Sequence, residues 1–93
     1  MNKEQIYKAS IRLWGEPSQV LMAIEEMSEL IKELTKWINK RTNIKDKILE
    51  EMADVEIMLE QLRVIFDCDS YINEVKILKL QRLAELIVKA EKK

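Results

Sequence analysis

The sequence predicts an all-α protein built from four helices, and three observations support this fold class. The single Gly and the single Pro lie together in WGEPSQ (14–19), so one strong break occurs in 93 residues. Hydrophobic residues are 47% of the chain and charged residues 35%, a balance typical of amphipathic helices and not of disorder. Apolar residues recur at helical spacing, without the alternation of strands. The short chain forms one domain, residues 1–93.

One short helix and three longer ones are expected. Gly15 can end the first helix in the left-handed conformation, and Pro17 can begin the second in its first turn. The polar segment 39–46 separates the second helix from the third. DCDS (67–70) precedes the fourth, which runs to about Glu91. The candidate N-caps are Thr42 or Asn43 for the third helix and Asp69 or Ser70 for the fourth.

Each long helix carries an apolar stripe that we expect to form the core. The stripes are Val20, Ile24, Met27, Ile31, Leu34 and Ile38 on the second helix, Ile48, Met52, Val55, Leu59, Leu62 and Phe66 on the third, and Ile72, Val75, Leu83, Leu86 and Ala90 on the fourth. On the second helix Ala23, Leu30 and Trp37 widen the apolar surface beyond what one neighbouring helix covers. The sequence therefore predicts a bundle completed by oligomerisation.

Composition and charge argue against several classes of function. The net charge of -1 does not favour nucleic-acid binding. No segment reaches the roughly 20 apolar residues of a membrane helix, and the N-terminal residues lack the apolar run of a signal peptide. A lone cysteine, Cys68, fits a reducing compartment, so we expect a cytoplasmic location. The chain has no histidine, which argues against a histidine-ligated di-iron site.

Two similar acidic blocks are the main functional signal: AIEEMSEL at 23–30 and ILEEMADV at 48–55. At about 100° per residue, Glu26 and Glu29 lie on one side of the second helix. Glu51 and Asp54 border the apolar stripe of the third. Helices joined by a short connection pack antiparallel, which brings the four acids together.

Such a cluster requires compensation. Two carboxylates about 4–5 Å apart repel by about 3–4 kcal/mol at an effective dielectric near 20. A divalent cation removes this cost, and ligation by oxygen alone suits Mg²⁺, with Mn²⁺ possible, and not zinc. The alternative interpretation is a solvated acidic face paired with lysines of the same helices, Lys32, Lys36 and Lys47.

The fourth helix carries cations on its apolar side. Lys79 falls inside the stripe, with Lys76 and Arg82 on either side of it. One interpretation is a lysine whose stem packs while its ammonium reaches water. The other is an anchor for phosphate next to the acidic cluster. The residues by themselves leave both open.

The spacing of these residues resembles that of the MazG-like all-α nucleoside triphosphate pyrophosphatases, over about residues 13–87. The family pattern E-E-x-x-E, a gap, then E-x-x-D matches Glu25-Glu26-Met27-Ser28-Glu29, 21 intervening residues, and Glu51-Met52-Ala53-Asp54. The lead-in G-x-x-x-Q of the family matches Gly15 to Gln19, and its late Lys-x-x-Arg matches Lys79 to Arg82.

The resemblance implies Mg²⁺-dependent hydrolysis of a nucleoside triphosphate to the monophosphate and pyrophosphate, in nucleotide-pool housecleaning. It implies Glu26, Glu29, Glu51 and Asp54 as metal ligands, and Glu25 or Glu50 as the group that orients or deprotonates water. Lys79, Arg82 and Lys76 would hold phosphates, and the relatives' assembly implies a homodimer or homotetramer. For the base, Trp37, like Trp14, Tyr7 and Tyr71, could stack on it or pack in the core or an interface. Gln19 could hydrogen-bond the base or cap its helix. The competing hypothesis is a helical interaction or regulatory module that keeps the acidic cluster but has little turnover. A plain helical dimer with solvated acids is a third.

Overall fold

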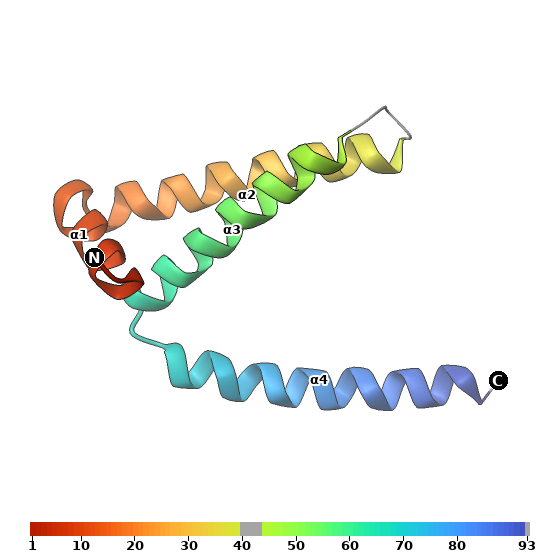
Figure 1. The fold of residues 1–93 in the computed structure, drawn as a ribbon. Helices are drawn as coiled ribbons and strands as arrows, with labels where there is room; N and C mark the ends of the chain where they lie inside the picture. Colours follow the sequence, from red (N-terminus) through yellow and green to blue (C-terminus); the bar gives the residue numbers. More distant parts are fainter. Residues whose placement is uncertain (40–43, 93) are drawn as a thin grey trace.

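The computed structural model describes residues 1–39 and 44–92. It contains four helices, α1 (Lys3–Trp14), α2 (Glu16–Ile38), α3 (Lys45–Ile65) and α4 (Asp69–Glu91), and no strand among these residues (Figure 1). The all-α prediction and the order of one short and three long helices are therefore confirmed. No described helix has an apolar stretch long enough to cross a membrane.

The junction between α1 and α2 follows the sequence signals closely. At the start of α1, Asn2 and Gln5 form a reciprocal capping box, each side chain accepting the other's backbone N–H at 2.8 and 2.9 Å. Gly15 ends this helix with φ 85° and ψ 153°, a conformation open essentially to glycine alone. Pro17 lies in the first turn of α2, as predicted.

The caps of α3 and α4 differ from the prediction. The N-cap of α3 is Ile44, while the candidates Thr42 and Asn43 lie outside the described residues. The N-cap of α4 is Cys68, without a side-chain bond, so Asp69 and Ser70 do not cap it. Asp69 instead accepts a hydrogen bond from Nη1 of Arg63 at 2.8 Å, which ties the start of α4 to the end of α3.

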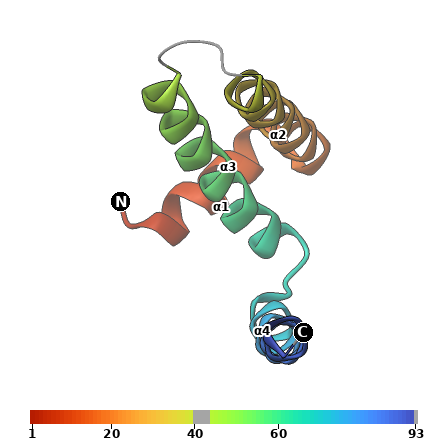
Figure 2. The same cartoon turned by 90° about the vertical axis from the view of Figure 1, so that its right-hand side faces the viewer.

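The helices do not form a closed bundle within one chain. α2 and α3 pack along their length as an antiparallel hairpin, and α1 lies across one end of it (Figures 1 and 2). After a short turn α4 runs back below the hairpin without packing on it in Figure 1, and Figure 2 shows it end-on, apart from the other helices. The radius of gyration is 16.9 Å, whereas a compact domain of this length has about 12 Å.

The seam between α2 and α3 uses a different face from the predicted one. The predicted stripe of α2 is largely exposed: Ile24 is 52%, Ile31 65% and Ile38 70% accessible. On α3, Val55 of the predicted stripe is buried, but Met52, Leu59 and Phe66 are exposed. Among the described residues, the buried ones are four apolar, Tyr7, Ala23, Val55 and Met58, and four polar, Gln19, Glu33, Glu51 and Gln61. This part of the chain thus buries as many polar as apolar side chains and leaves its most hydrophobic stripes uncovered.

A polar contact holds α1 to α3. The hydroxyl of Tyr7 donates a hydrogen bond to Glu60, and Nζ of Lys3 pairs with the same carboxylate at 3.3 Å. Burial and the neighbouring Glu60 carboxylate raise the pKa of Tyr7 to about 12. The pKa of Glu60 is lowered, chiefly by the hydrogen bond from Tyr7. Glu60 is therefore a structural acid, distinct from the acidic cluster.

Candidate metal centre

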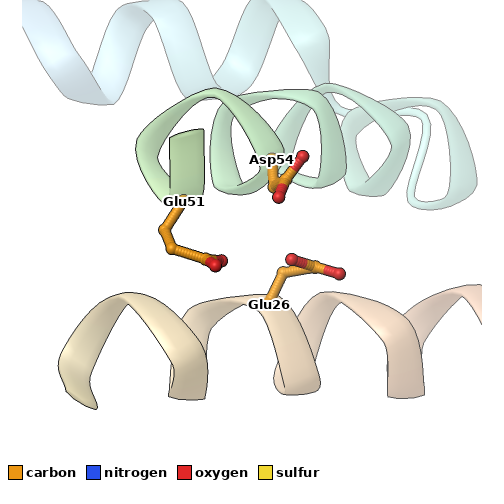
Figure 3. A group of neighbouring side chains, drawn as sticks. All are labelled: Glu26, Glu51 and Asp54. Carbon is orange, nitrogen blue, oxygen red and sulfur yellow. The ribbon is translucent and has the colours of Figure 1, made fainter. Parts of the chain in front are cut away.

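Three carboxylates converge in the seam between α2 and α3. Glu26 projects from α2, and Glu51 and Asp54 project from successive turns of α3 (Figure 3). One oxygen of each side chain lies within 4.8 Å of the others. Glu51 is 5% accessible, Glu26 is half-buried and Asp54 is exposed, so the cluster is buried on one side and open on the other. The helix spacing that predicted a convergence of acids is thus realised for these three.

The electrostatics of the cluster are unfavourable for three negative charges. Burial, followed by the charges of Asp54 and Glu51, a hydrogen bond shared with Asp54 and the charge of Glu29, raises the pKa of Glu26. Only one cation pairs closely with the cluster among the described residues: Nζ of Lys47 lies 3.1 Å from Oε1 of Glu51. The other oxygen, Oε2, is buried and has no hydrogen-bond partner there.

This arrangement fits a hard divalent cation. The donors are all carboxylate oxygens, which Mg²⁺ and Mn²⁺ prefer. Ligands on opposite sides of an octahedral Mg²⁺ are about 4.2 Å apart, so a group spanning up to 4.8 Å closes on the ion with a small side-chain shift. The unpartnered Oε2 of Glu51 is a buried acceptor that such an ion would satisfy. Because Asp54 is exposed, water can reach the cluster from that side.

The other predicted acidic residues surround the cluster without joining it. Glu29, the fourth predicted ligand, is exposed and lies outside the group of three, although its charge contributes to the raised pKa of Glu26. Glu25 and Glu50, the candidates for orienting water, are exposed on the flanks of α2 and α3. Glu50 has one distant pairing, with Nζ of Lys47 at 4.0 Å.

The two candidates for base recognition have opposite environments. Gln19 is 1% accessible, and its Nε2 is buried without a hydrogen-bond partner in the described residues. It therefore belongs to the interior of the seam, two turns before Glu26. Trp37, in contrast, is 63% accessible near the end of α2, about three turns beyond Glu26.

The predicted phosphate-binding cations are not brought to the carboxylates of their own chain. Lys76, Lys79 and Arg82 lie on α4, which has no extensive packing against α2 or α3. Every described residue from 76 to 92 is exposed. The sequence placed these cations on one face of a helix, but only the tertiary structure determines where that helix lies.

Two further polar residues of α3 bear on the seam: Lys47, which is exposed, and Gln61, which is buried. Lys47 was considered only as a partner on a solvated face, yet its ion pair is with the buried carboxylate of Glu51. Gln61 is 6% accessible, with Oε1 unpartnered in the described part of the chain. The signal for Gln61 was its spacing of seven residues from Asp54, which places it on the same side of α3.

A scan against models of protein families, a search of curated proteins and a search of solved structures each give no match. The functional assignment therefore depends on the residues, their geometry and the motif resemblance.

Proposed function

We propose that this protein is a Mg²⁺-dependent nucleoside triphosphate pyrophosphohydrolase of the MazG-like type, which acts in the clearance of nucleotides. The observation that carries the proposal is the convergence of Glu26, Glu51 and Asp54 from two packed helices, with one buried Glu51 oxygen left unpartnered. These three positions belong to the E-E-x-x-E and E-x-x-D motifs of that family. Mn²⁺ has the same ligand preferences and is the natural substitute.

The proposed reaction is attack of water at the α-phosphorus, with cleavage of the bond to the bridging oxygen and release of pyrophosphate. When bound, the ion neutralises polyphosphate charge, polarises the phosphoryl oxygens and makes water a better nucleophile. Glu26, Glu51 and Asp54 would hold the ion, with Glu29 completing the set from the exposed side. Glu25 or Glu50, each close in sequence to a ligand, would orient the water or accept its proton.

The proposal includes a homo-oligomer as the functional form. The described chain buries few apolar residues and exposes most of its predicted core stripes. A small domain with so little buried apolar surface gains its stability from association. Subunit contact would also bring further side chains next to the site, which in one chain is open on the side of Asp54.

The direct test measures pyrophosphate and monophosphate release from a panel of canonical and modified nucleoside triphosphates, with Mg²⁺ and with EDTA. We expect both products in equal amounts, with Mg²⁺ only. Release of inorganic phosphate in place of pyrophosphate would contradict attack at the α-phosphorus.

The isolated position of α4 gives the competing hypothesis a specific basis, since among the described residues only Lys47 pairs with the acidic cluster, and the cations of α4 do not reach it. A helical regulatory module would bind Mg²⁺ without turnover. If no substrate of the panel gives product, but Mg²⁺ still raises the melting temperature, the regulatory module is favoured.

A further inference from the structure

The surface of one chain is too large for a stable monomer. The chain exposes 7819 Å², whereas a folded monomer of 11.1 kDa exposes about 5,700 Å². About 2,100 Å² per chain is therefore left uncovered. If two copies each buried that amount, the interface would total about 4,200 Å², within the range of obligate dimers. Much of this surface belongs to α4, which has no buried residue along its 23 residues.

The hairpin of α2 and α3 has one apolar and one acidic side. At about 100° per residue, the exposed apolar stripe of α2 and that of α3 point to the same side of the seam between the two helices. The middle of the opposite side, which we call the acidic face, consists of Met22, Glu25 and Glu29 on α2 and Glu50, Asp54 and Ile57 on α3, all exposed. Lys32, Lys36 and Lys47 lie on the same side, towards the end of α2 and the start of α3. Segments 22–29 and 50–57, in which these residues lie, contain seven acids and no Lys or Arg.

α4 has the complementary pattern. Its segment 75–84 contains Lys76, Lys79 and Arg82 and no acid. These cations flank or interrupt the stripe made by Ile72, Val75, Leu83 and Leu86, so one face of α4 is both apolar and cationic. We call it the cationic face. A second exposed apolar surface, with Ile77, Leu80 and Ile87, lies on an adjoining side of the helix.

We propose that a second copy of this chain lays the cationic face of its α4 on the acidic face of the hairpin, so that Lys79 and Arg82 serve the carboxylate cluster in trans. Within one chain α4 stands apart from the hairpin (Figures 1 and 2), and its cations do not reach their own cluster. The role of the cations as phosphate ligands rests on the proposed function, whereas the docking itself rests on area and charge.

The similar lengths of the helices place Lys79 of a docked α4 beside Glu26 and Asp54 of the hairpin. α2, α3 and α4 contain 23, 21 and 23 residues, so a helix laid along the hairpin overlaps it from end to end. Lys79 is one residue from the midpoint of α4, and Glu26 and Asp54 are each one residue from the midpoints of α2 and α3. Overlap therefore brings Lys79 level with the cluster whichever way the partner helix runs.

Zero-length cross-linking tests this docking without reference to activity. Wild-type chains labelled with ¹⁴N and ¹⁵N are mixed by unfolding and refolding, treated with a carbodiimide in metal-free buffer, digested and analysed by mass spectrometry. We expect amide links between Lys76 or Lys79 and acids of 22–29 or 50–57, with about half of the linked pairs carrying mixed labels, as random pairing in a two-fold dimer gives. Lys89, near the end of α4, is the internal control and should link less. Links with uniform labels only, or no links to these segments, would overturn the proposal.

A matched pair of variants tests the face of α4 that docks. Leu83→Glu adds a carboxylate to the cationic face, and Gln81→Glu adds the same group about 200° round the helix. By light scattering we expect a dimer for the wild type and for Gln81→Glu. For Leu83→Glu we expect dimer dissociation at concentrations at least tenfold higher, with unchanged helix content by circular dichroism. A monomeric wild type, or equal association of the two variants, would contradict docking through the cationic face of α4.

Complementation then separates action in trans from action in cis. Glu51→Gln lacks a ligand, and the double variant Lys79→Ala, Arg82→Ala lacks the cations, so each alone should be nearly inactive. A refolded one-to-one mixture should regain about one quarter of the wild-type sites, because only mixed dimers contain one intact site. No recovery, with an active wild type, would rule out action in trans. A wild type without Mg²⁺-dependent turnover would refute the proposed function, and cross-linking would still decide the docking.

Discussion

Substitution of Glu51 by Gln is expected to stabilise the metal-free protein while it removes the response to Mg²⁺. Glu51 has carboxylate oxygens of Glu26 and Asp54 within 4.8 Å. Two full charges at that distance repel by about 3–4 kcal/mol at an effective dielectric near 20. Gln keeps the size of the side chain and removes both repulsions.

Two effects reduce this gain. The ion pair between Glu51 and Lys47 is lost, but Lys47 is half exposed and solvent screens the pair. The raised pKa of Glu26 indicates that partial protonation can already relieve some repulsion. We therefore expect a net stabilisation of about 1–2 kcal/mol, which raises the melting temperature of a domain of this size by about 5–15 °C.

The assay is thermal unfolding followed by circular dichroism at one fixed chain concentration, in EDTA and in MgCl₂. Mg²⁺ at ten times its dissociation constant should stabilise the wild type by about 1.4 kcal/mol and the variant far less. Glu56→Gln is the control, because Glu56 is exposed elsewhere on α3, and its effect should stay within about 0.5 kcal/mol. A variant less stable than the wild type in EDTA, with the same Mg²⁺ shift, would refute both the repulsion and the ligand assignment.

Three further predictions address the rest of the molecule. Tyr7→Phe removes the hydrogen bond to Glu60 and should destabilise the fold by about 1 kcal/mol in a urea titration. Because the pKa of Tyr7 is raised from 10.0 to about 12, its contribution is present below pH 10 and is lost between pH 10 and about 12, so wild type and variant should converge there. Gly15→Ala meets no close atom, with Cδ of Pro17 at 3.9 Å, but φ 85° should make it about 1–3 kcal/mol less stable in the same titration. By calorimetry, Asp54→Asn should weaken Mg²⁺ binding by about 10-fold or more and Glu29→Gln by less, since Glu29 lies outside the cluster; equal losses would contradict that ranking.

Local signals in the sequence were reliable where one residue determines the backbone. Gly15 and Pro17 predicted the break between α1 and α2, because positive φ and a proline in a first turn are local requirements. The caps of α3 and α4 were predicted less well. Ile44 and Cys68 occupy those positions without side-chain caps, so other contacts, such as the bond from Arg63 to Asp69, hold the start of α4.

The convergence of acidic residues from α2 and α3 was also predictable, since it follows from helical periodicity and from the antiparallel packing of two helices joined by a short loop. Glu26 and Asp54 lie one residue from the midpoints of α2 and α3, and Glu51 lies about one turn before Asp54, so the three meet in the seam. Glu29 lies outside the group, since a shift of three residues turns it about 60° away from the seam.

The sequence by itself determined the helices, their amphipathic faces and the pairing of two acidic blocks, because these depend on residue type and spacing. Only the tertiary structure decided which faces meet. In α2 the seam uses Gln19, Ala23 and Glu33, and the more hydrophobic stripe with Ile24 and Ile31 remains exposed. A hydrophobic stripe specifies that a helix needs a neighbour but does not say whether that neighbour is in the same chain. For the same reason the position of α4, and with it the position of Lys79 and Arg82, could not be read from the spacing of its residues.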